Sequence, residues 1–81
     1  MQYKTIALGL LTADPARDER LKASRLLTPT IHRLSAELKS RHLDWIDGLT
    51  RRSPTEDPER IRHQALELAI EELRARLSSS D

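Results

Sequence analysis

Three proline dipeptides constrain the fold of this chain more than any other feature of its sequence. Asp14-Pro15, Thr28-Pro29 and Asp57-Pro58 each place an oxygen-bearing side chain directly before a proline. The oxygen can accept a backbone N–H from the first turn of a helix, and the proline ring holds the φ angle that this turn needs. Each pair therefore predicts the beginning of a helix.

Two helical segments are expected in the first third of the chain. Residues 2–12 carry apolar residues at the spacing of one helix face: Tyr3, Ile6, Ala7, Leu10 and Leu11. A β-strand is the competing interpretation there, because Thr5 and Gly9 weaken a helix. The second segment spans residues 15–27, and its narrow apolar side predicts shallow burial of four residues: Ala16, Ala23, Leu26 and Leu27.

The third segment, residues 29–47, has the clearest pattern. Its apolar stripe contains Ile31, Leu34, Leu38, Trp45 and Leu49, and the opposite face, expected to be solvated, contains Arg33, Glu37, Arg41 and Asp44. Gly48 predicts the end of this helix, and residues 49–56 predict the main loop. In an alternative, Pro29 kinks one continuous helix over residues 15–47.

The last segment, residues 58–77, has the widest apolar face. At about 100° per residue, more than half of its circumference is apolar: Ile61, Ala65, Leu66, Leu68, Ala69, Ile70, Leu73 and Leu77. One neighbouring helix cannot cover such an arc, so we expect two neighbours, either from the same chain or from a second copy. Residues 78–81 are expected to form a disordered polar tail.

Composition supports an all-α fold. Leu, Arg, Ala, Glu and Lys supply 43 of the 81 residues, as in long helices, and Tyr3 and Trp45 are the two aromatic residues. We therefore predict a small bundle of three or four antiparallel helices in one domain over residues 1–77. Such a small core competes with a deep pocket for the same apolar side chains, so we expect no enzyme and no small-molecule substrate.

No residue pattern in the chain predicts a cofactor or metal site. Cysteine is absent, and the three histidines are too far apart to place two on one turn of a helix. His63 lies four residues from both Glu59 and Glu67, a pattern that could hold a metal but is more typical of an exposed surface. His42 lies within an apolar stripe, which predicts a buried imidazole with a hydrogen-bond partner, with a pH switch or catalytic base as alternatives.

The chain also lacks an apolar run that could cross a bilayer. Such a run needs roughly 18 residues, and the apolar stretch near the start covers only residues 6–11. We therefore expect a soluble cytoplasmic protein with no membrane partner.

Charge is unevenly distributed along the chain, although the net charge is +1. Residues 20–41 contain six basic residues against Glu37 alone, whereas residues 55–81 contain seven acidic residues against four basic ones. The basic segment could follow nucleic-acid phosphates, or it could face the acidic segment within one bundle. The candidate contacts in a nucleic-acid-binding accessory or regulatory protein are Arg20, Lys22, Arg25 and Arg33.

Three short segments resemble a known group of proteins. They are Met1-Gln2-Tyr3-Lys4-Thr5-Ile6 with Leu8-Gly9-Leu10-Leu11, then Ala36-Glu37-Leu38-Lys39-Ser40, and Ala65-Leu66-Glu67-Leu68-Ala69. This combination resembles a group of short uncharacterised bacterial proteins that open in the same way. The resemblance spans most of the chain and implies no activity, because no function is assigned to that group.

Our main functional expectation is contact with another protein or with a second copy of this chain. The last segment has more apolar residues than one neighbouring helix can cover, and tryptophan often anchors interfaces. The candidate contacts are therefore Trp45, Leu66, Ile70, Leu73 and Leu77. The competing interpretation is that all five belong to the core of a monomer.

Overall fold

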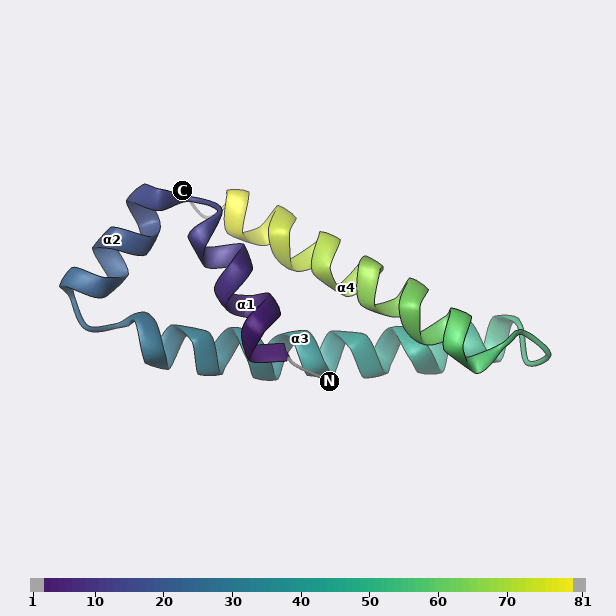
Figure 1. Cartoon of the computed structure of the whole chain (residues 1–81). Helices are drawn as coiled ribbons and strands as arrows, with labels where there is room; N and C mark the ends of the chain where they lie inside the picture. The colour runs from purple at the N-terminus through teal and green to yellow at the C-terminus, as the bar shows by residue number, and fades with distance from the viewer. Residues whose placement is uncertain (1–2, 80–81) are drawn as a thin grey trace. The chain divides into compact units, whose positions relative to one another are not determined.

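A computed structural model of the chain describes residues 3–79. Within this range it contains four α-helices and no strand. The helices carry their labels in Figure 1. The helices are α1 (Tyr3–Thr12), α2 (Pro15–Ala23), α3 (Leu27–Arg52) and α4 (Pro58–Ser79). The predicted all-α class is confirmed, and the first segment is a helix and not a strand.

The chain divides into two compact units, Met1–Glu37 and Leu38–Asp81, with the boundary inside α3. The arrangement as one antiparallel bundle in a single domain stays a prediction, and each unit is described separately below.

Two of the three proline signatures begin helices as predicted. The Asp14 side chain accepts the backbone N–H of Arg17 at 3.3 Å, and the Asp57 side chain accepts that of Glu59 at 3.1 Å. The third signature was misread, because α3 begins at Leu27, which places Thr28 and Pro29 inside its first turn. Proline is tolerated there because the first four N–H groups of a helix have no partner within the helix.

The helix α2 ends four residues earlier than predicted, at Ala23. Arg25 adopts a φ of 61°, and its N–H donates to the Lys22 carbonyl while the N–H of Leu26 donates to the Leu21 carbonyl. This pair of bonds is the Schellman motif, in which a residue with positive φ closes a helix. The chain therefore turns sharply between α2 and α3, which rules out the continuous helix over residues 15–47.

The helix α3 extends five residues beyond its predicted end, through Gly48 to Arg52. Neither glycine in the chain has a positive φ, so Gly48 does not act as a left-handed stop. Proline disfavours the helical conformation in the residue before it, so Pro54 makes Ser53 the residue after the helix. The loop is accordingly shorter than predicted, covering residues 53–57.

In the first unit, α1 packs against α2. Three apolar side chains of this unit are fully buried: Ala7 and Leu11 from α1, and Leu34 from α3. The predicted apolar side of α2 was wrong, because Ala16, Ala23 and Leu26 are exposed and Leu27 belongs to α3. The residue that α2 buries is instead the acid Asp18.

In the second unit, α4 turns back beside the C-terminal half of α3, as Figure 1 shows. The buried side chains of α4 recur at every fourth position: Ile61, Ala65, Ala69 and Leu73. This is one face of a helix, and α3 contributes the buried Leu38 and His42 to the same unit. The helix also continues through Ser79, two residues beyond its expected end, while the rest of the predicted tail lies outside the described residues.

Gly9 and Gly48 lower the stability of the helices that contain them. Both lie inside helices, and a Cβ added to either would meet no atom within 4 Å. Glycine inside a helix costs roughly 0.5–1 kcal/mol relative to alanine. We expect Gly9→Ala and Gly48→Ala each to raise the free energy of unfolding by up to about 1 kcal/mol, measured by urea denaturation. A loss of stability would mean that one of these positions is more crowded than described.

Candidate interaction surfaces

A buried histidine joins the two helices of the second unit. The Nε2 atom of His42 lies 3.0 Å from the backbone oxygen of Arg62, and the residue is 1% exposed. A carbonyl oxygen can only accept, so Nε2 carries the hydrogen and donates it. The predicted burial with a satisfied hydrogen bond is confirmed.

Trp45 lies beside an acidic residue of the opposite helix. Its indole Nε1–H donates to Glu72 Oε1 at 2.6 Å, and Arg41 lies 3.6 Å from the other carboxylate oxygen of Glu72. Arg41 is therefore half-buried against α4, although the sequence pattern placed it on a solvated face. The hydrogen bond from Trp45 and the ion pair from Arg41 thus both connect α3 to Glu72 on α4.

A pocket of about 340 Å³ opens beside this tryptophan. It is lined by Arg41, Asp44, Trp45, Gly48 and Glu72, all within the second unit. We call it the Trp45 pocket. Its volume is at the lower end of the range for small-molecule sites, which is roughly 300–1,000 Å³, so it could take a side chain or a similarly small group.

An apolar surface lies on the other side of the same helix pair. Leu43 lies two residues before Trp45, and Ile70 lies two residues before Glu72. Two residues of an α-helix turn by about 200°, so side chains at this spacing point in nearly opposite directions. Leu43 and Ile70 are therefore both directed away from the side where Trp45 meets Glu72.

Two further residues widen this apolar surface. Ile46 lies one turn after Leu43, and Leu66 lies one turn before Ile70. Leu43 is 51% exposed, and the other three are partly exposed. We call these four residues the Leu43 face.

The five predicted interface residues do not form one surface. Leu66 and Ile70 belong to the Leu43 face, and Leu77 is partly exposed farther along α4. Leu73 is fully buried, which makes it a core side chain, and Trp45 lies with Glu72 on the other side of the helix pair. The sequence analysis did not predict Leu43 as a contact residue. Its spacing of one helical turn from the apolar Ile46 could have indicated a shared apolar face.

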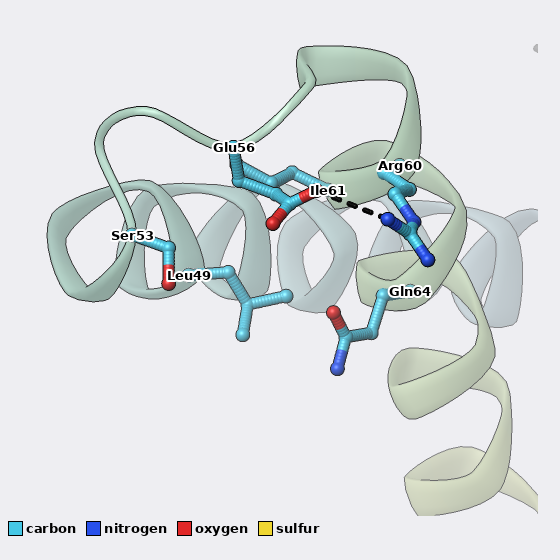
Figure 2. Close-up of a pocket in the computed structure, with 6 residues that line it drawn as sticks. All are labelled: Leu49, Ser53, Glu56, Arg60, Ile61 and Gln64. Carbon is cyan, nitrogen blue, oxygen red and sulfur yellow. Dashed lines mark ion pairs between the residues drawn. The ribbon is translucent and has the colours of Figure 1, made fainter.

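A second pocket, of about 280 Å³, lies where α3 and α4 meet the loop, as Figure 2 shows. It is lined by Leu49, Ser53, Glu56, Arg60, Ile61 and Gln64. Glu56 Oε1 and Arg60 Nη1 are 3.5 Å apart and form an ion pair, so the two charges largely offset each other. None of these lining residues is a histidine, the base that most often activates a serine hydroxyl.

The four predicted nucleic-acid contacts lie in the first unit and are all exposed. Lys22 forms an ion pair with Asp18 at 2.9 Å. Arg20, Arg25 and Arg33 have no ion pair with any of the residues 3–79. Three guanidinium groups of this unit are therefore available to an anion.

Among residues 3–79, no three side chains of His, Cys, Asp or Glu lie together in a way that could hold a metal ion. In the pattern considered for His63, Glu59 pairs with Arg62 instead. The buried carboxylate of Asp18 has one oxygen without a hydrogen-bond partner in the described part of the chain, and Lys22 is its ion-pair partner.

None of the helices in residues 3–79 has the length and apolar character needed to cross a bilayer.

Comparisons of the chain with protein-family models, with curated proteins and with solved structures give no match.

Proposed function

We propose that this protein acts without chemistry of its own, by binding a second copy of itself through the Leu43 face. The observation that carries the proposal is the exposure of Leu43, which is 51% exposed beside three partly exposed apolar neighbours. Removing apolar surface from water is the main favourable term in most protein association. Apolar side chains that are exposed together on one side of a protein often mark a contact site.

A second copy suits this surface for two reasons. A two-fold contact pairs the same patch on both molecules, so the apolar patch of one copy meets the apolar patch of the other. The net charge of +1 also keeps the repulsion between two copies small.

The expected dimer is weak. If each of the eight side chains in a two-fold contact contributes about half of the roughly 1.5–3 kcal/mol for burying a large apolar side chain, the total is about 6–12 kcal/mol. Association itself costs an estimated 4–15 kcal/mol. We therefore expect a dissociation constant no tighter than micromolar.

Leu43→Lys should abolish the dimer while leaving the protein folded. Lysine at this exposed position adds a charge to the contact without opening the core. Sedimentation equilibrium at concentrations from about 10 to 500 µM, chosen around a micromolar constant, measures the effect, and circular dichroism verifies the fold. Ile70→Lys should act in the same direction.

Leu26→Lys is the matched control, because Leu26 is 52% exposed but lies in the first unit. It should leave the dimer unchanged. A wild-type protein that is monomeric over the whole concentration range would overturn the proposal. So would equal effects of the substitutions at Leu43 and Leu26.

A second candidate function is nucleic-acid binding, which is favoured by three arginines of the first unit that form no ion pair with any of the residues 3–79. Cationic side chains that neutralise phosphates release condensed counterions, which makes affinity fall steeply with salt. The residues concerned are Arg20, Arg25 and Arg33, since Lys22 is already paired with Asp18. This candidate uses a different unit from the proposed dimer contact.

Replacing Arg20, Arg25 and Arg33 together by Ala should flatten the salt dependence of binding to duplex DNA. Each lost phosphate contact lowers the slope of log K against log salt by about 0.9. Fluorescence anisotropy with a labelled random-sequence duplex at several NaCl concentrations measures this slope. No binding at the lowest salt concentration would remove the candidate.

A further inference from the structure

We propose that the Trp45 pocket is a binding site for an arginine side chain presented by a partner protein. The pocket lies on the opposite side of the helix pair from the Leu43 face, so this proposal stands independently of self-association. Three features of the second unit support it: a glycine that the fold does not require, an acid with no ion pair among residues 3–79, and the single tryptophan of the chain.

Gly48 leaves open a space that another side chain could occupy without strain. Its φ is not positive, and a Cβ at this position would meet no atom within 4 Å. Glycine is therefore not needed for the backbone conformation or for close packing, and it weakens the helix. Its effect is to keep the space beside Trp45 and Asp44 free, because these residues lie three and four positions earlier on the same face of α3.

The charge around this space favours a cation. Asp44 is exposed and has no ion pair or hydrogen bond with any side chain of residues 3–79. Glu72 supplies a second carboxylate, although it also accepts from Trp45 and pairs with Arg41. The lining contains one arginine and two acids, so its net charge is negative. The ion pair between Arg41 and Glu72 leaves the negative charge of Asp44 unbalanced within the lining.

Arginine is the side chain that this combination of groups fits. Its guanidinium forms planar hydrogen bonds with carboxylates, and tryptophan is the aromatic residue that attracts cations best. Its three methylene groups can lie along apolar surface while the charge stays near Asp44. A partner side chain entering over Gly48 would thus bring its charged end to Asp44, which forms no ion pair within residues 3–79.

Nuclear magnetic resonance on the full chain can test the site directly. The probe is the tripeptide Gly-Arg-Gly, acetylated and amidated to remove its terminal charges, and the control is Gly-citrulline-Gly, which is neutral and of similar shape. The arginine peptide should shift the Trp45 indole and Gly48 amide resonances in a saturable way at millimolar concentration. The Gly9 amide, in the first unit, should not move.

Two substitutions with a matched control locate the binding. Asp44→Asn should weaken it by roughly 3-fold, because exposed ion pairs contribute about 0.2–1 kcal/mol. Gly48→Leu should abolish the shifts by filling the pocket. Asp47→Asn removes a neighbouring acid that lies outside the pocket and pairs with Arg51, so it should leave the affinity unchanged.

Several results would overturn the proposal. They are an absence of shifts at Trp45 and Gly48, equal shifts with the citrulline peptide, and equal weakening by the substitutions at Asp44 and Asp47. A monomeric protein that still binds the arginine peptide would reject the proposed dimer and leave this site intact. The two proposals can therefore fail separately.

Discussion

Leu38→Ala should lower the free energy of unfolding by about 2–5 kcal/mol, the range measured for leucine truncations in protein cores. Leu38 is fully buried in α3, so its loss removes apolar contacts and leaves a cavity that the surroundings fill only in part. Leu73→Ala should have a similar effect from α4, where the side chain is also fully buried. Urea denaturation followed by circular dichroism measures both changes.

Leu43→Ala provides the control for these truncations, because it removes the same atoms from a side chain that is 51% exposed. It should cost less than about 1 kcal/mol, since surface substitutions rarely exceed half of that value. The comparison is best made at a concentration where the protein is monomeric. Equal losses at Leu38 and Leu43 would show that the core is placed wrongly.

His42→Ala should lower the free energy of unfolding by about 2–4 kcal/mol, combining a cavity with a lost buried hydrogen bond. The imidazole is 1% exposed and donates to the Arg62 carbonyl, so it contributes both packing and polar pairing between α3 and α4.

His42→Leu separates these two contributions. Leucine keeps most of the side-chain volume and gives up the hydrogen bond, so the expected loss is nearer 1 kcal/mol. Urea denaturation of the two variants gives the comparison. If both variants unfold with the stability of the wild type, the imidazole has no structural role.

Features that depend on a few neighbouring residues were predictable from the sequence. Asp14-Pro15 and Asp57-Pro58 predict where α2 and α4 begin, because a cap and a proline act within one helical turn. The burial of His42 was also predictable, since its position in an apolar stripe follows from helix periodicity. The all-α class was predictable for the same reason, because apolar spacing and composition agree over most of the chain.

Other features were decided by the tertiary structure, because they depend on residues far apart in the sequence. The helix periodicity of the sequence places Arg41 on the solvated face of α3, yet it forms an ion pair with Glu72 on α4. Gly48 has the character of a helix stop, but α3 continues past it to the proline-bearing loop and packs beside α4. Local preference at such a position is worth about 1 kcal/mol, which tertiary packing readily outweighs.

The candidate interaction surfaces were the least predictable part of the molecule. Helix periodicity identifies apolar positions, but it cannot distinguish a side chain covered by the rest of the chain from one left in water. Leu73 and Leu43 have the same chemistry, and only the fold makes the first a buried core residue and the second 51% exposed. The sequence therefore determined which side chains are apolar, and the packing of the chain decided which of them remain available to a partner.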